Sequence, residues 1–354
     1  MVKLWKLLLR NPIRSCRFIH AFVTQVFIVT LKRALLPGWP HYQSYRLQLQ
    51  RCYWASSSFY FPEVVHRLPV TDCPSSEARR VGLDWSGYVI PGTKNLKDLQ
   101  FSDLNPNTCI AIYAHGGCYA RGEARMYLNY MKRWTQGAAA VGLDITFLSV
   151  EYPLSDEAPH PAQREAFLKA YQYVLDQGIP AHNVIFMGDS AGGGLCVLSA
   201  FEAKRQGLPQ PAGSVLISPW MDMALRSHVG GNALAETDYV AGANLTMPKF
   251  VAAWLNGVSP NSPDVNPLCR PPSDFKDLNP FLIMIGGGEF ALHDGKDLAA
   301  LCEAAGLLHH LEIEWGQLHL YALGSQWVSP EVRQKTDAMI YRWIRECLDR
   351  ATAA

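Results

Sequence analysis

Short apolar runs alternate with longer amphipathic segments from about residue 80 to the end of the chain. The runs are almost continuous and five to eight residues long, which is typical of strands buried on both faces of a sheet. Strands are predicted at 108–114, 145–152, 183–187, 213–219, 281–286 and 309–315, with a strand or hairpin at 79–90. Helical spacing is found at 161–178, 191–207, 296–306 and 330–350. The pattern predicts an α/β fold with a mostly parallel central sheet and helices on both faces.

One stretch, residues 220–268, interrupts this alternation. It is rich in Asn, Gly, Pro and Asp around a single apolar, helix-like piece at 247–258. We interpret it as an insertion that covers the sheet together with the N-terminal residues. The expected organisation is an N-terminal extension and helical cap at 1–75, followed by a main domain at 76–354 with a cap insertion around 220–268.

The first 33 residues differ in charge from the rest of the chain. They contain seven basic residues and no acidic one, and a run of fourteen mostly apolar residues lies between Arg17 and Lys32. A membrane-spanning helix needs about 20 apolar residues, so this run is short for that purpose. Three interpretations remain open: a helix of the cap, a helix on a membrane surface, and a cleaved signal peptide. We expect an intracellular protein, with the endoplasmic reticulum membrane as the candidate surface for residues 1–33.

Composition narrows the class of protein. With 354 residues, of which 49% are hydrophobic and 18% charged, the chain can bury a large core. A net charge of +1 gives no reason to expect a nucleic-acid partner. The nine cysteines include no C-x-x-C pair, which argues against a zinc site and favours reduced thiols. We expect no metal and no organic cofactor, and the oligomeric state is left undecided.

A glycine-rich turn carries the strongest chemical signal. The strand at 183–187 leads into Gly-Asp-Ser-Ala-Gly at 188–192, and a helix follows. Small residues at this point allow the chain to reverse sharply and hold the hydroxyl of Ser190 exposed, as in the G-x-S-x-G elbow. The free N–H groups of the following helix favour a developing negative charge. Ser190 is therefore the predicted nucleophile, and Asp189 is expected to support the turn.

A serine nucleophile needs a base, and the base needs an acid to orient it. In this elbow the acid follows the serine along the chain, and the histidine follows the acid. Two acids lie beyond the strand at 281–286, namely Glu289 and Asp294. Glu289 is closer to the end of the strand, inside a glycine-rich turn. We predict Glu289 as the acid and keep Asp294 as the alternative.

Four histidines are candidates for the base. His319 follows the strand at 309–315 and lies in a loop, where its imidazole can reach the nucleophile. His309 and His310 lie at the beginning of that strand, which is the opposite edge of a parallel sheet. His293 lies beside the acid candidates. We predict His319 as the base.

The loop after the strand at 108–114 is suited to stabilise an oxyanion. Backbone N–H groups held in a turn are the usual donors, and glycines let the backbone approach the substrate. The predicted donors are the N–H groups of Gly117, Cys118 and Ala191, with Gly116 shaping the turn. His115 is interpreted as a structural residue that holds the loop.

Aromatic residues near the strand ends are candidates for the substrate site. Tyr119 and Trp220 are predicted to bind substrate, and Asp222 is interpreted as a brace behind the site. Trp254 and Tyr321 are weaker candidates for lining the substrate site. Ordinary core packing is the alternative for each of these aromatic side chains.

Several of these pieces occur together in the order of one known family. The matching segments are HGGCY, EYPLSDEAPHPAQREA, GDSAGGGL, SPWMD, GGGEFALHDG and GQLHLY, and they cover roughly residues 80–345. The chain resembles the hormone-sensitive lipase-like family of α/β-hydrolases. The resemblance implies hydrolysis of carboxylic esters, with Ser190 as nucleophile, Glu289 as acid and His319 as base, beneath an N-terminal cap over the acyl pocket.

Two departures from the family pattern are informative. Cys118 stands where the family usually has a third glycine, which places a side chain at the pocket wall. Glu289 stands where the usual acid is Asp. The Glu and the long N-terminal extension look more like the fungal branch, which includes steryl acetyl hydrolases and hydrolases of secondary-metabolite pathways. The leading expectation is a serine carboxylesterase acting on an apolar ester. The alternative is a pathway hydrolase that performs acyl transfer, lactone opening or closing, or an aldol-type step on a polyketide-like intermediate.

Overall fold

The computed structural model describes residues 4–36, 43–61, 73–98, 107–226 and 238–353. Its centre is an eight-stranded sheet with the order β1-β2-β4-β3-β5-β6-β7-β8. The strands are β1 (Arg79–Val81), β2 (Gly87–Ile90), β3 (Thr108–Ala114), β4 (Asp144–Val150), β5 (Val184–Asp189), β6 (Gly213–Ile217), β7 (Phe281–Gly286) and β8 (His309–Glu314). The six strands from β4 to β8 run parallel, whereas β2 pairs antiparallel with both β1 and β4. The predicted mostly parallel sheet is confirmed.

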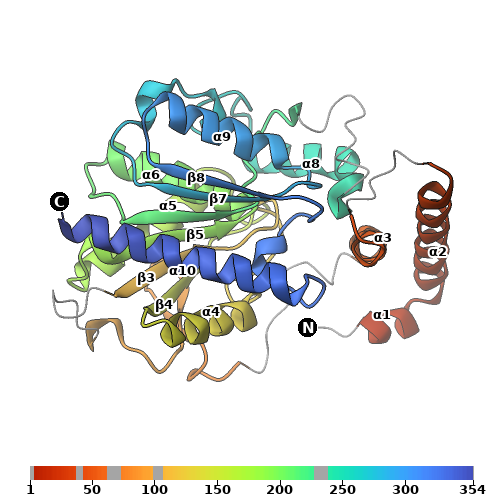
Figure 1. Cartoon of the computed structure of the whole chain (residues 1–354), viewed down its shortest axis with the longest axis horizontal. Coiled ribbons are helices and arrows are strands. Elements are labelled where there is room, and N and C mark those ends of the chain that lie inside the picture. The colour runs from red at the N-terminus through yellow and green to blue at the C-terminus, as the bar shows by residue number, and fades with distance from the viewer. Residues whose placement is uncertain (1–3, 37–42, 62–72, 99–106, 227–237, 354) are drawn as a thin grey trace.

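Helices cover both faces of this sheet (Figure 1). On one face lie α4 (Leu128–Ala140) and α10 (Pro330–Ala353). On the other face lie α5 (Ala162–Asp176), α6 (Ala191–Arg205) and α9 (Leu292–Ala304). Strands β3 to β7 are buried along almost their whole length, because both faces are covered. Helix α4 was not among the predicted elements, although its buried residues follow helical spacing.

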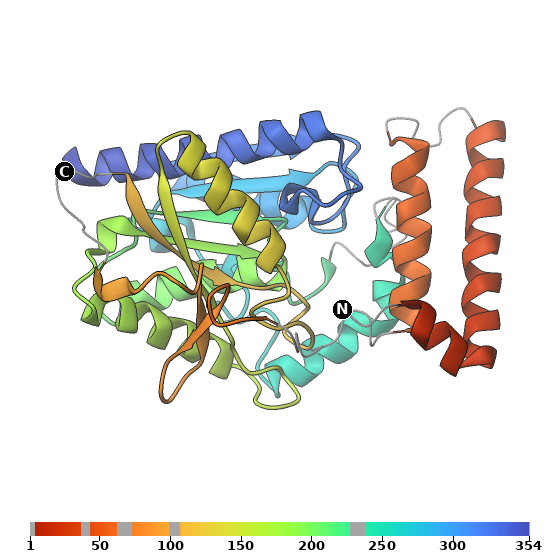
Figure 2. The same cartoon turned by 90° about the horizontal axis from the view of Figure 1, so that it is seen from below.

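Three N-terminal helices stand at one end of the molecule (Figure 2). They are α1 (Leu4–Arg10), α2 (Pro12–Leu35) and α3 (Tyr45–Tyr60). Helices α2 and α3 pack side by side, and α3 contacts the short helix η5 (Tyr239–Gly242). Next to η5 follows α8 (Ala243–Leu255), which belongs to the segment interpreted as an insertion. Helix α3 therefore lies between α2 and the main domain.

Candidate active site

The turn between β5 and α6 holds Ser190 in a strained backbone conformation. Its φ is +51°, a region that non-glycine residues rarely adopt, and its side chain is buried to 4% exposure. Two backbone hydrogen bonds fix the turn: Ser190 N donates to Ile217 O at 2.9 Å, and Ser190 O accepts from Trp220 N at 2.9 Å. Such strain is found where the surrounding structure holds a functional group in position.

The glycines behind Ser190 are required by close packing of α6. A Cβ atom on Gly192 would lie 2.0 Å from the carbonyl oxygen of Ala114 at the end of β3. Real Cβ atoms do not come so close to a backbone oxygen, so any larger residue would push α6 away from β3. The glycines cost helix stability, roughly 1 kcal/mol each relative to Ala, and in return bring the N-terminus of α6 directly under the nucleophile.

The imidazole of His319 lies against this serine. His319 Nε2 is 3.0 Å from Ser190 Oγ, which is hydrogen-bond distance, and both side chains are buried. The ring packs on Phe290 with 4.6 Å between centroids. Burial lowers the pKa of His319 because it disfavours the charged ring, while the charges of Asp238 and Asp189 act in the opposite direction. The neutral imidazole favoured by burial is the form that can accept a proton.

Glu289 stands on the other side of the ring. Its Oε1 is 3.7 Å from His319 Nδ1, and among the described residues neither of these two atoms has a hydrogen-bond partner. Its Oε2 accepts hydrogen bonds from Ser218 Oγ at 2.6 Å and from Gly286 N at 3.0 Å. Complete burial raises the pKa of Glu289, and these two donors oppose the rise by stabilising the carboxylate.

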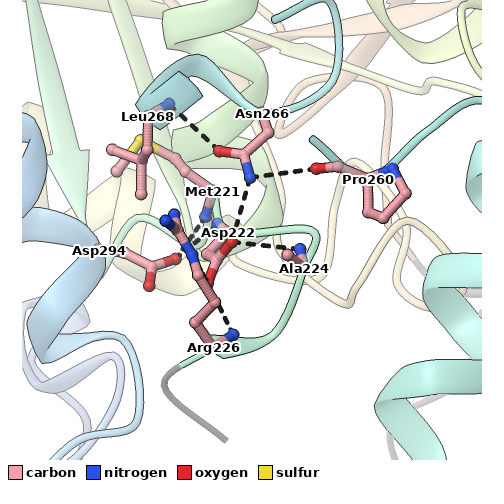
Figure 3. A network of polar contacts seen from close by, with 8 residues as sticks. All are labelled: Met221, Asp222, Ala224, Arg226, Pro260, Asn266, Leu268 and Asp294. Carbon is pink, nitrogen blue, oxygen red and sulfur yellow. Dashed lines mark hydrogen bonds and ion pairs between the residues drawn. The ribbon is translucent and has the colours of Figure 1, made fainter. Parts of the chain in front are cut away.

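Asp294, the alternative acid, binds backbone N–H groups and not the imidazole (Figure 3). Its Oδ2 accepts from the backbone N–H groups of Met221 at 2.7 Å and Asp222 at 2.9 Å. It thus holds the segment after β6 and is not paired with His319. The geometry selects Glu289 as the partner of the imidazole.

The expected bracing role of Asp222 agrees with its contacts (Figure 3). Its carboxylate accepts from Ala224 N at 3.1 Å, from Arg226 N at 2.8 Å and from Asn266 Nδ2 at 3.1 Å. Because Asn266 lies at the far end of the 220–268 segment, this contact ties the two ends of that segment together.

The other candidate histidines lie away from the serine. His309 and His310 begin β8, at the opposite edge of the sheet, and His310 is 3.7 Å from Glu312. His293 lies exposed in the first turn of α9. His115 is fully buried and stacks on the Tyr152 ring with centroids 4.2 Å apart, as a structural role requires.

The loop after β3 is held close to the nucleophile by Asp189. The Asp189 carboxylate accepts from Gly116 N at 3.0 Å, from Tyr113 OH at 2.7 Å and from Tyr127 OH at 3.1 Å. Burial raises the pKa of Asp189 to about 6, although these three donors lower it. Asp189 therefore joins the elbow to the adjacent loop, as the sequence indicated.

Three backbone N–H groups are available near Ser190. Gly117 and Cys118 have φ angles of +120° and +57°, and both residues line the same cavity as Ser190. Within the described parts of the chain, no residue accepts a hydrogen bond from either of their backbone N–H groups. Ala191 is the first residue of α6, where helix geometry leaves the N–H without an intrahelical acceptor. The positive φ at Cys118 shows that a glycine would adopt this conformation more easily.

A mainly apolar cavity of about 240 Å³ lies over Ser190 and His319. Three sets of residues line it. The lining comes from α3 (Trp54, Ala55, Phe59), from the loop after β3 (Gly117, Cys118, Arg121, Met126, Tyr127), and from the later segments (Tyr239, Val240, Met247, Phe250, Phe290, Leu320). The guanidinium of Arg121 packs over the Phe250 ring at 5.0 Å. The cavity is thus lined jointly by α3 and by the part of the 220–268 segment that contains η5 and α8.

The structure places Tyr119 and Trp220, the predicted substrate-binding residues, in the core beside the site. Both side chains are buried and neither lines the cavity. The Tyr119 ring stacks on Trp254 with centroids 4.2 Å apart, and Trp220 lies 6.2 Å from Tyr119. Tyr119 has a φ of +58°, which turns its ring from the loop into this aromatic cluster. Tyr321 is packed in the core on the opposite face of the sheet.

Two residues of the site escaped the sequence analysis. Ser218 follows the carboxyl end of β6, where functional residues are expected in a parallel sheet, so its position was a usable signal. Asp238 lies in an irregular part of the 220–268 segment and gave no signal. It accepts from Phe290 N at 3.0 Å and from His319 N at 3.4 Å, and burial raises its pKa to about 6. Asp238 therefore fixes the backbone that carries the imidazole.

In the described part of the chain, no group of three or more His, Cys, Asp or Glu side chains is placed to hold a metal ion. The chemistry that the described residues can perform is acyl transfer by an activated serine.

Comparison with known proteins agrees with this geometry. Residues 111–323 match a family described as having the α/β hydrolase fold. An acetyl-hydrolase of Streptomyces hygroscopicus is 34% identical over 194 residues, which are 55% of this chain and 60% of that protein. An esterase of Acinetobacter venetianus is 27% identical over 227 residues, covering 64% of this chain and 72% of that protein. The chain thus matches about three-fifths to three-quarters of the length of these relatives.

Solved structures agree in fold over most of the chain. A crystal of EstE5 soaked with p-nitrophenyl butyrate has a TM-score of 0.64 at 27% identity, over 91% of this chain and 98% of that one. An esterase from the bacterial hormone-sensitive lipase family has a TM-score of 0.64 at 25% identity, over 92% of this chain and 98% of that one. The chain belongs to the hormone-sensitive lipase-like family of α/β-hydrolases.

Proposed function

We propose that this chain is a serine esterase that hydrolyses apolar carboxylic esters through an acyl-enzyme on Ser190. The observation that carries the proposal is the 3.0 Å contact between Ser190 Oγ and His319 Nε2 at the floor of an apolar cavity. A buried serine in a strained turn, with a neutral imidazole at hydrogen-bond distance, is arranged for nucleophilic attack on an acyl carbon.

The proposed reaction has two halves. Ser190 Oγ attacks the ester carbon while His319 Nε2 takes its proton, and Glu289 stabilises the imidazolium from the Nδ1 side. The oxyanion is held by the backbone N–H groups of Gly117, Cys118 and Ala191. His319 then protonates the leaving alcohol. In the second half, a water molecule that loses its proton to His319 attacks the acyl-enzyme, which releases the acid and restores the serine hydroxyl.

The cavity supports an ester with a short acyl group. Its volume of about 240 Å³ is slightly below the usual range for ligand pockets, and its lining is mainly apolar. The Streptomyces relative is named an acetyl-hydrolase, and p-nitrophenyl butyrate was soaked into crystals of EstE5. For this chain we infer acetyl to butyryl esters of apolar alcohols as the preferred class.

A finer placement within the family is also proposed. Glu289 at the acid position and the N-terminal extension support a place beside the fungal steryl acetyl hydrolases and secondary-metabolite hydrolases. On this placement the natural alcohol would be a large apolar molecule. The same acyl-enzyme could then pass its acyl group to an alcohol or amine instead of water.

Hydrolysis of p-nitrophenyl esters from acetate to decanoate tests the proposal. The wild type should cleave the short esters, whereas Ser190→Ala should lose turnover and also lose labelling by a fluorophosphonate probe. Ser199→Ala is the matched control, because Ser199 is also a buried serine of this region but lies two turns along α6.

Three outcomes are informative. Cleavage by the wild type and the control, but not by Ser190→Ala, supports the esterase. If the wild type cleaves no ester of the series but the probe labels Ser190, simple esters are not the substrates and a dedicated pathway substrate is favoured. If the probe labels neither protein, the assignment of Ser190 as nucleophile is refuted.

A further inference from the structure

Helix α2 exposes a long apolar stripe. Ile19, Val23, Phe27, Leu31 and Leu35 follow one another at intervals of four residues, and each is at least 45% exposed. Residues four apart are neighbours on a helix and are offset by about 40° around its axis, so these side chains form one continuous ridge that winds across the exposed half of α2. We call this stripe the outer face of α2. Contiguous apolar surfaces of this kind are uncommon on soluble proteins and mark interaction sites.

The opposite face of α2 already has its partner, helix α3. Phe18 is 6% exposed, and its ring meets the rings of Tyr53 and Phe61 at 6.5 Å and 5.8 Å between centroids. Phe22 meets Tyr53 in the same edge-on manner at 6.5 Å. Figure 2 shows α2 as the outermost helix of the molecule, with α3 between it and the main domain. In the described structure the outer face of α2 therefore points away from the rest of the chain.

The charge around this helix is one-sided. Residues 1–61 contain nine of the 32 Lys and Arg residues of the chain and none of its 31 Asp and Glu residues. Arg17 is exposed at one end of the apolar stripe, and Lys32 and Arg33 lie near the other end. A stripe of apolar residues with basic residues at its ends is complementary to a lipid surface that carries negative charge.

Polar contacts oppose a membrane-spanning orientation. The helix has the length and composition to cross a bilayer, and only 11% of its most apolar window is buried in the protein. Crossing would take its inner face into lipid as well. On that face, Arg14 donates to Tyr60 O at 2.7 Å and Arg33 donates to Gln43 O at 2.8 Å, so the two guanidinium groups bind backbone oxygens at opposite ends of α3. Breaking these bonds and burying both cations in lipid is costly.

We propose that the outer face of α2 docks the protein onto the surface of an anionic phospholipid membrane, with α2 lying in the plane of the interface. This orientation keeps every contact between α2 and α3. Helix α3 supplies Trp54, Ala55 and Phe59 to the cavity over Ser190. Both α2 and α3 would then lie between the lipid and the cavity, which places the cavity about two helix diameters, roughly 20 Å, from the lipid surface, where apolar esters accumulate.

Flotation of the full chain with vesicles tests the docking. The wild type should float with vesicles of phosphatidylcholine and phosphatidylserine, more weakly with phosphatidylcholine alone, and less as salt is raised. The double variant Val23→Glu/Phe27→Glu should lower the partition coefficient about tenfold or more, since it places two anions in the stripe. All proteins should hydrolyse a water-soluble ester at the same rate, which shows that each is folded and separates this test from that of the esterase.

The matched control carries the same change of charge elsewhere. Leu83 and Val141 are also exposed apolar residues, at 104% and 52%, but they belong to the β1–β2 turn and to the end of α4. Leu83→Glu/Val141→Glu should float like the wild type. Equal loss of flotation in both double variants would show that net charge alone governs binding and would overturn the proposal.

Two further results would also overturn it. Resistance of the bound protein to extraction by alkaline carbonate would show that α2 spans the bilayer and does not lie in its plane. Failure of the wild type to float, together with a dimer that Val23→Glu/Phe27→Glu dissociates in light scattering, would show that the outer face binds a second copy of the chain.

Discussion

The hydroxyl of Ser218 should determine at which pH Glu289 becomes charged. Ser218 Oγ donates to Glu289 Oε2 at 2.6 Å in a site where burial raises the pKa of that carboxyl group. A hydrogen bond to a charged group contributes about 1.5–3 kcal/mol, and one pKa unit corresponds to about 1.4 kcal/mol. Replacement by Ser218→Ala should therefore raise the pKa of Glu289 by roughly one to two units.

The sign of the effect on activity follows from the charge that catalysis needs. Only ionised Glu289 can orient the Nδ1–H group of His319 and stabilise the imidazolium. At a pH below the pKa of Glu289, most of this carboxyl group is protonated and cannot do so. A higher pKa moves the acidic limb of kcat/KM to higher pH by the same one to two units. On that limb the variant should be about 10- to 100-fold slower than the wild type, and alkaline buffer should restore most of its activity.

Initial rates on p-nitrophenyl acetate from about pH 5 to about pH 10 would measure this shift. Ser199→Ala is again the control, because its hydroxyl is buried and makes no hydrogen bond in the described structure. Its pH profile should superimpose on that of the wild type. If Ser218→Ala instead lowers kcat/KM equally at every pH, Ser218 acts by holding the loop, and the electrostatic reasoning is refuted.

Three other substitutions test separate parts of the site. Asp238→Asn should lower kcat about 10-fold or more with little change in KM, because it removes a negative charge that favours the imidazolium of His319. An unchanged kcat would show that Asp238 acts only through its hydrogen bonds to backbone N–H groups. Gly192→Ala should destabilise the fold by about 1–3 kcal/mol in urea unfolding, since its Cβ would meet a β3 carbonyl oxygen at 2.0 Å; an unchanged midpoint would contradict the close packing of α6. Cys118→Gly should raise the ratio of decanoate to acetate cleavage several-fold. It removes a side chain from the cavity wall, and each additional methylene that the cavity accommodates contributes about 0.8 kcal/mol. An unchanged ratio would show that the acyl chain does not bind beside Cys118.

Much of the architecture was readable from the periodicity of the chain. The buried strands β3, β5, β6 and β7 lie close to where continuous apolar runs predicted them, because a strand covered on both faces needs apolar residues at every position. The antiparallel hairpin β1–β2 also lies within the predicted segment. The periodicity does not predict the order of the strands within the sheet. The pairing of β4 with β2 therefore could not be derived from it.

The sequence predicted those residues of the site that follow the carboxyl ends of strands. Ser190 directly follows β5, Glu289 and His319 lie in the loops after β7 and β8, and parallel strands bring their carboxyl ends to one edge. The lining of the cavity was not readable in this way. Tyr119 was expected to meet substrate, but its own backbone conformation turns the ring into the core.

By itself, the sequence determined the alternation of strands and helices, the strained serine turn, and the basic, acid-free N-terminus, because each depends on residues that are close together in the chain. Only the tertiary structure decided between Glu289 and Asp294. The two carboxylates are five residues apart, but one approaches His319 to 3.7 Å and the other binds the segment after β6. It also revealed Asp238, because a buried carboxylate is defined by the groups that fold around it and not by its neighbours in sequence.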